Sequence, residues 1–132
     1  MRNTVTLDFN IWQRIILEAD RRFENTSPTG LFVNSLLDRD VMMYWVEKIS
    51  QIPHNEDTFM EVRNALYFEY DSQCRAMISM IRLNKYVTKT LPNMFSHAFS
   101  RIDWSKAARF MMWVTNYMLS HSEEVEKWET EQ

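Results

Sequence analysis

The shortage of glycine restricts the fold of this chain more than any other feature of its sequence. Among 132 residues there is one glycine, Gly30, and there are three prolines. Tight hairpins and loops that cradle phosphate groups depend on glycine, because glycine adopts positive φ angles without a steric cost. The sequence therefore disfavours a β-rich fold and excludes glycine-rich nucleotide-binding loops, which leaves helices as the main building elements.

Apolar residues recur at helical spacing along most of the chain. Positions three and four residues apart begin near Asp8, resume at Leu31 and resume again at Phe59. The prolines fall between these segments, where helix ends are expected. The second segment fits either one helix or two helices that are separated at residues 38–40.

Two segments, Cys74–Thr88 and Trp104–Leu119, are apolar on nearly every side. Asp71 or Ser72 is expected to end one helix and to cap the first of them. Because a helix that is hydrophobic all round is normally buried, we predict that these are the two most buried helices. The expected fold is all-α: one domain over residues 1–132, with six to eight helices around a central hydrophobic hairpin.

No pattern in the sequence is typical of catalysis or of metal binding. His54, His97 and His121 have no partners at ligand spacing, and neither Cys-x-x-Cys nor His-Glu-x-x-His occurs. Cys74 opens an apolar segment, so a buried thiol is expected there and not a nucleophile. We therefore expect no enzyme activity, no metal and no cofactor.

Charge and hydropathy restrict the partners. The net charge is −3, so nucleic acid is not an expected partner, since binding phosphates requires a basic face. The sequence begins without the apolar run of a signal peptide, and its one cysteine cannot form an internal disulfide. We expect a cytoplasmic location, with membrane association only if an anchor has been removed from the chain.

Ten methionines and five tryptophans allow two interpretations. Methionine fills irregular gaps in cores. Methionine-rich apolar surfaces also form grooves that receive amphipathic helices. The two interpretations are compatible, and composition by itself favours core filling.

Parts of the chain resemble the B-cell lymphoma-two (Bcl-two) family of apoptosis regulators. The family's first homology region is similar to Phe59-x-x-Val62, Tyr67-Phe68-Glu69-Tyr70-Asp71 and Arg75-Ala76-Met77-Ile78-Ser79-Met80. The second central helix of its pro-survival members is similar to the stretch from Arg109 to Tyr117, followed by His121 and Glu123. The Asn-Trp-Gly of the family signature is Ser72-Gln73-Cys74 here, and the Gly-Gly-Trp of the second homology region is missing. Viral members diverge to this degree, so the resemblance suggests a viral protein, such as one from a fish iridovirus.

The resemblance implies an apoptosis inhibitor that sequesters pro-apoptotic host proteins, such as Bim, by holding their BH-three helix in a surface groove. It implies a location in the host cytoplasm, including the mitochondrial outer membrane. It places the groove walls on Val41–Ile49 and Phe59–Leu66, and it places Arg75 at the floor, where it pairs with a ligand aspartate. The implied groove residues are Val41, Trp45, Val46, Ile49, Phe59, Val62, Leu66, Arg75, Ala76 and Ser79.

Three alternatives remain open at this point. The stretch Phe99–Phe110 also resembles the first homology region, with Lys106 in place of the arginine, but the periodicity that marks both apolar segments favours the placement on Arg75. The chain could also be a Bcl-like viral adaptor that binds signalling proteins without a working groove, or a helical structural or assembly protein. An empty apolar groove tends to be covered, so a homodimer that competes with the ligand is expected.

Overall fold

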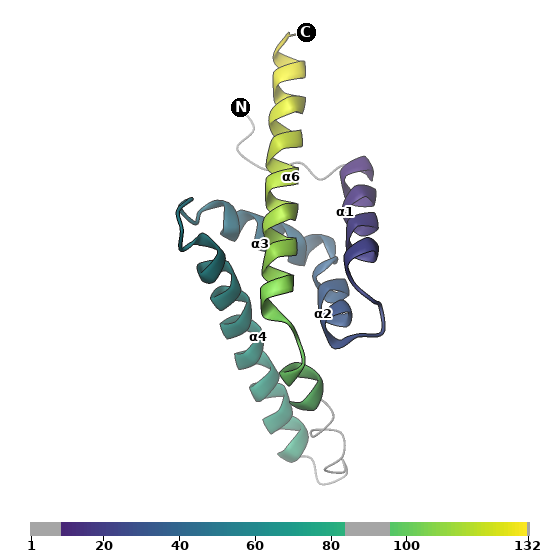
Figure 1. The fold of residues 1–132 in the computed structure, drawn as a ribbon, viewed down its shortest axis with the longest axis vertical. Helices are drawn as coiled ribbons and strands as arrows, with labels where there is room; N and C mark the ends of the chain where they lie inside the picture. The colour runs from purple at the N-terminus through teal and green to yellow at the C-terminus, as the bar shows by residue number, and fades with distance from the viewer. Residues whose placement is uncertain (1–8, 84–95, 132) are drawn as a thin grey trace.

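The protein is built from helices. The computed structural model describes residues 9–83 and 96–131, with side chains at 9–80 and 96–121. These residues form α1 (Phe9–Arg22), α2 (Pro28–Leu36), α3 (Arg39–Ser50), α4 (Thr58–Leu83) and α6 (Trp104–Glu131), together with a short helical segment at 96–100. No strand occurs in this part of the chain, so the predicted all-α fold is confirmed there (Figure 1).

Polar caps separate the helices. The side chain of Ser27 accepts a hydrogen bond from the backbone N–H of Gly30, and Pro28 occupies the first turn of α2. The carboxylate of Asp38 accepts hydrogen bonds from the N–H groups of Asp40 and Val41, at 3.0 and 3.2 Å. Asp38 therefore begins a new helix, and the segment that fitted either one helix or two contains two.

Gly30 is required by close packing and not by a turn. Its φ angle is not positive, although glycine is often selected for that reason. A Cβ atom at this position would lie 1.9 Å from the backbone oxygen of Glu24. A larger residue would therefore push α2 away from the chain segment that leaves α1.

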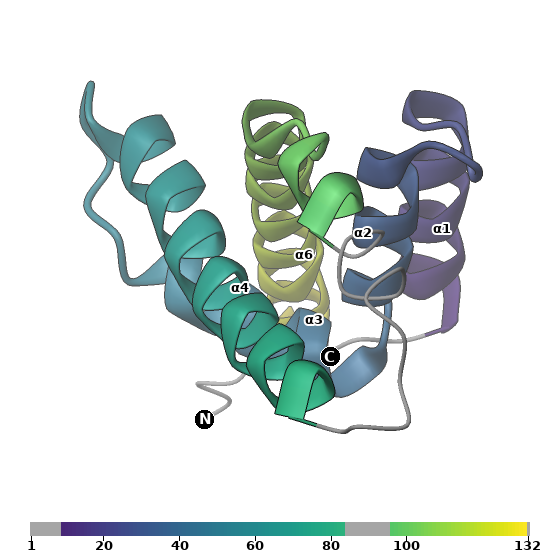
Figure 2. The same cartoon turned by 90° about the horizontal axis from the view of Figure 1, so that it is seen from below.

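Helix α6 forms the centre of the bundle. It contacts α1, α2, α3 and α4 (Figures 1 and 2), and it makes its largest contact with α4. Over residues 104–121 the exposed side chains are those of Lys106, Arg109, Asn116 and Ser120, which lie along one side. The prediction that Trp104–Leu119 is a buried helix is confirmed, and its buried residues are Ala107, Ala108, Phe110, Met111, Val114, Thr115 and Met118.

Helix α4 is continuous through Asp71 and Ser72, so the predicted break there is wrong. The carboxylate of Asp71 does not cap a new helix but forms an ion pair with Arg75 one turn later, at 2.9 Å. Nothing in α4 interrupts the backbone, because the helix contains neither proline nor glycine. The 26 residues from Thr58 to Leu83 therefore form one helix instead of two.

The buried positions of α4 recur at every fourth residue. They are Thr58, Val62, Leu66, Cys74 and Ile78, with Tyr70 partly buried between them. A step of four residues exceeds the 3.6 residues of a helical turn, so this stripe winds around the helix. Helices that pack along such rows cross at an inclined angle, and α4 is visibly inclined to α6 (Figure 1).

The second half of α4 is not buried as predicted. Between residues 74 and 80 only Cys74 and Ile78 are buried, whereas Met77 is 39% exposed and Met80 is 73% exposed. The expectation that Cys74–Thr88 belongs to the two most buried helices is therefore wrong for residues 74–80; side chains 81–88 lie outside the described part. The described segment that faces this half of α4 is the stretch 96–104 before α6, which lies along one side of it (Figure 1), and the side chains at 75–77, 79 and 80 remain exposed.

Candidate functional site

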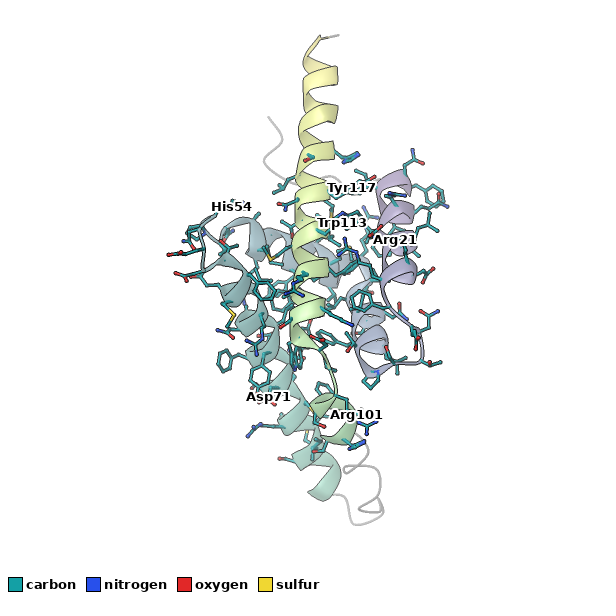
Figure 3. The ribbon with its side chains drawn as sticks, viewed as in Figure 1. Arg21, His54, Asp71, Arg101, Trp113 and Tyr117 are labelled. Atoms are coloured by element: carbon teal, nitrogen blue, oxygen red, sulfur yellow. The ribbon has the colours of Figure 1, made fainter. Side chains whose placement is uncertain are left out.

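A groove separates the second half of α4 from the segment that leads into α6. Its volume is about 730 Å³, and it is partly open to solvent. Asp71 lies on the α4 side, and Arg101 lies on the facing segment (Figure 3). The lining residues are Tyr67, Asp71, Cys74, Arg75, Ile78, Ser79, Ser96, Phe99, Ser100, Ile102 and Trp104.

The floor of the groove is apolar. Cys74 and Ile78 line the groove from α4 and Ile102 lines it from the facing segment, and all three side chains are buried. Aromatic rings form the wall above them. The ring of Tyr67 packs edge-to-face against Trp104, with centroids 5.5 Å apart. Such a contact holds two large side chains in a fixed arrangement at one end of the groove.

The rim of the groove is polar and carries one ion pair. The Nε atom of Arg75 lies 2.9 Å from a carboxylate oxygen of Asp71, and the Arg75 side chain is 77% exposed. Exposed serines at positions 79, 96 and 100 continue this rim. Arg75 therefore lies at the rim, and not at the floor where the sequence resemblance placed it.

The length of the groove suits a helical ligand. From Tyr67 to Ser79 the α4 wall spans twelve residue steps, which is about 18 Å at the rise of an α-helix. A ligand helix of roughly three turns has the same length. An apolar floor between polar rims also matches the two faces of an amphipathic helix.

Cys74 contributes packing to the groove and not reactivity. Burial raises the pKa of its thiol, and the nearby Asp71 carboxylate raises it further. A reactive cysteine needs an exposed, electropositive site that stabilises the thiolate. The prediction that Cys74 is buried is confirmed.

Most of the predicted groove residues lie in the core. Five of them are at most 6% exposed and pack between α3, α4 and α6: Trp45, Val46, Ile49, Val62 and Leu66. Val41 and Phe59 are partly buried against the same core. The expected groove walls on Val41–Ile49 and Phe59–Leu66 are therefore corrected, because α3 and the first half of α4 both pack on α6 and enclose their apolar faces.

A hydrogen bond closes the space between α3 and α4 where the groove was expected. The indole N–H of Trp45 donates to the hydroxyl of Tyr70 at 2.7 Å. The Tyr70 ring also packs edge-to-face on Phe32 of α2, with centroids 5.1 Å apart. Among the predicted residues Arg75 and Ser79 do line the observed groove, whereas Ala76 is exposed outside it.

The alternative placement of the first homology region contributes the other wall. Phe99, Ile102 and Trp104 belong to the stretch Phe99–Phe110 and line the groove opposite Arg75. Lys106, which that placement puts in the role of the arginine, is exposed and lines a separate pocket of about 330 Å³ beside Arg22. Residues of the two stretches thus line opposite sides of one groove, although no groove residue was predicted at Phe99, Ile102 or Trp104.

Within residues 9–83 and 96–131, no group of histidine, cysteine and acidic side chains is arranged to hold a metal ion. Over these ranges no helix combines the length and the apolar character that crossing a membrane requires.

Comparisons with models of known protein families, with curated proteins and with solved structures gave no match to this chain.

Proposed function

We propose that this protein is an apoptosis inhibitor whose groove between α4 and residues 96–104 receives the BH-three helix of a pro-apoptotic protein such as Bim. One observation supports the proposal most directly. An apolar floor formed by Cys74, Ile78 and Ile102 lies beside a rim that carries the Arg75 guanidinium. The resemblance of the sequence to the Bcl-two family supplies the identity of the ligand, and the groove supplies a receptor of suitable shape.

An amphipathic helix fits this groove better than a small molecule does. The groove is open and about 18 Å long, whereas small-molecule sites usually enclose most of their ligand. A helix would place its apolar residues on Ile78 and Ile102 and leave its polar face in solvent. An aspartate on that helix would reach the Arg75 guanidinium, which is exposed at the rim.

Arg75 is expected to contribute moderately to binding. It already pairs with Asp71 in the free protein, so a ligand carboxylate would share the guanidinium with that residue. An exposed ion pair contributes about 1 kcal/mol or less, but a contact that the docked helix shields from water contributes more. We expect the Arg75→Glu variant to bind a BH-three peptide at least roughly tenfold more weakly, which corresponds to about 1.4 kcal/mol.

A fluorescence-anisotropy titration with a labelled Bim BH-three peptide tests the proposal. Lys106→Glu provides a matched control, because it reverses the same charge at an exposed residue outside the groove. This variant should bind within about twofold of the native protein, since an exposed lysine contributes little.

Three outcomes would change the proposal. If the native protein binds no BH-three peptide at micromolar concentrations, the assignment to apoptosis fails. If Lys106→Glu abolishes binding and Arg75→Glu does not, the ligand lies on the side that the alternative placement marks. If both variants bind normally, neither basic residue meets the ligand carboxylate, and the mechanism fails at this contact.

A further inference from the structure

One side of α4 presents an aromatic ring that the described part of the chain leaves largely exposed. Phe68 is 66% exposed, and its described ring contact is with Tyr67 next to it, with centroids 5.4 Å apart. Steps of three and four residues place Phe68, Asp71, Arg75 and Ile78 on the same side of the helix. This side of α4 is also the side that forms the groove.

These four residues form a self-complementary pattern. Asp71 and Arg75 lie two positions before and two positions after Gln73, while Phe68 and Ile78 lie five positions before and five after it. In an antiparallel pair of α4 helices with a two-fold axis at Gln73, residues at equal distances from this position meet. Asp71 of each copy would lie opposite Arg75 of the other, and Phe68 opposite Ile78.

We propose that a second copy of this chain docks on α4 in this antiparallel arrangement. Each Phe68 ring enters the groove of the partner beside Ile78, and the two Asp71–Arg75 pairs form a cluster of four alternating charges. Such an interface is isologous and closes after two copies, because each copy supplies both halves of every contact.

Charge complementarity favours a second copy over an unrelated partner. Asp71 and Arg75 lie at equal distances from Gln73 in the sequence of α4. The exposed ring of Phe68 and the buried side chain of Ile78 also lie at equal distances from Gln73. An unrelated partner would need the same four features in reverse order. Another copy of this chain has them by symmetry.

Sedimentation velocity over a concentration series tests this interface. Native protein should dimerise, and Phe68→Asp should weaken the dimer at least roughly tenfold. Met80→Asp is the matched control, because Met80 is an equally exposed apolar residue of α4 that lies away from the groove side, and it should leave the dimer within about twofold. A native protein that stays monomeric at high concentration, or equal losses in both variants, would overturn the proposal.

A charge-reversal pair separates the interface from any effect on folding. Asp71→Arg and Arg75→Asp should each remain monomeric alone, because like charges would meet across the two-fold axis. An equimolar mixture should form a heterodimer, since the basic surface of one variant meets the acidic surface of the other. A misfolded variant cannot be rescued in this way, and a mixture that stays monomeric would refute the antiparallel arrangement.

The self-association does not depend on binding of a BH-three helix, and the two proposals can fail separately. Phe68 does not line the groove of its own chain, but in the dimer it would occupy the groove of the partner, so the Phe68→Asp variant should bind the Bim peptide at least as tightly as the native protein. A dimer without peptide binding would leave the interface standing and refute the proposed function. Peptide binding by a protein that never dimerises would do the reverse.

Discussion

The central helix α6 and the second half of α4 have similar apolar patterns in the sequence but differ in how much of their surface is buried. Both are apolar on nearly every side, yet over 104–119 α6 is enclosed by four other helices, while residues 74–80 of α4 have buried side chains at Cys74 and Ile78 only. An apolar pattern therefore indicates that a segment needs to be covered, but not which element covers it. In the dimer proposed above, a second copy covers the groove side of this half of α4.

The two helices also differ in how closely their neighbours approach. Ala107 and Ala108 face the core near the start of α6, and both are fully buried. Small side chains allow several helices to approach one axis, and the larger Phe110 and Met111 fill the space that follows. In α4 the buried stripe winds around the helix, so its second half presents a narrower apolar row to the rest of the bundle.

The largest expected difference between the two regions concerns a pair of methionines. Met111 on α6 is fully buried, whereas Met80 on α4 is 73% exposed. Met111→Ala should lower the free energy of unfolding by about 2–5 kcal/mol, because it removes packed atoms and leaves a cavity. Met80→Ala should change it by roughly 0.5 kcal/mol or less. Urea unfolding at low protein concentration measures both, and equal losses would show that Met80 is covered within the single chain.

A smaller effect is expected where α4 leaves the core. Tyr70 accepts the hydrogen bond from the buried indole of Trp45, and Tyr70→Phe would leave that donor without its partner. The cost should be about 1–3 kcal/mol of unfolding free energy. Tyr67→Phe, one turn earlier and beside the groove, keeps the ring contact with Trp104 and should cost roughly 0.5 kcal/mol or less. If the two variants are equally stable, the Trp45–Tyr70 bond does not anchor α4.

The smallest effect concerns the ion pairs of Glu18 within α1, beside the contact of that helix with α6. The carboxylate of Glu18 accepts hydrogen bonds from Arg21 and Arg22, at 2.5 and 2.7 Å, and these bonds lower its pKa from 4.5 to about 2. The Arg22 guanidinium lies over the Trp113 ring of α6, 5.4 Å from its centroid. Since Arg21 is largely exposed, Glu18→Gln should cost about 1 kcal/mol at neutral pH.

The sign of the pH dependence follows from the direction of that shift. A carboxylate whose pKa is lowered by folding stabilises the protein above its unfolded pKa of 4.5, and this contribution is lost as the pH falls toward 2. The difference in unfolding free energy between native protein and Glu18→Gln should therefore shrink between pH 5 and pH 2. Asp20→Asn, at an exposed neighbouring position, serves as the control. A difference that stays constant over this range would exclude the charged pair as the cause.

Local chemistry explains why much of the fold was predictable from sequence. The start of α3 at Asp38 and the end of that helix before Pro53 depend on neighbours a few residues away. The same holds for the helical spacing that identified Trp104–Leu119. The continuous α4 escaped prediction because Asp71 is equally suited to capping a helix and to pairing with Arg75 inside one, and no local signal separates the two.

The candidate site was only partly predictable. Val62 and Leu66 of α4 have the apolar character expected of groove walls, and they became core because α3 and α6 pack on them. Arg75 and Ser79 line the observed groove, but its facing wall of Phe99, Ile102 and Trp104 follows only from the approach of a segment twenty or more residues away.

The sequence by itself determined that this chain is helical, where most of its helices begin and end, and that α6 would be buried, since these properties arise from spacing, caps and prolines within a few turns. The tertiary structure decided which apolar faces are enclosed and which remain at the surface, because each depends on residues far apart in the chain. The hydroxyl of Thr29 illustrates this, because it accepts a hydrogen bond from the backbone N–H of Asp103, 74 residues later, at 2.9 Å. That contact joins α2 to the residue before α6 at the smaller pocket that both residues line, and no pattern of spacing or composition predicts a bond between two residues so distant in sequence.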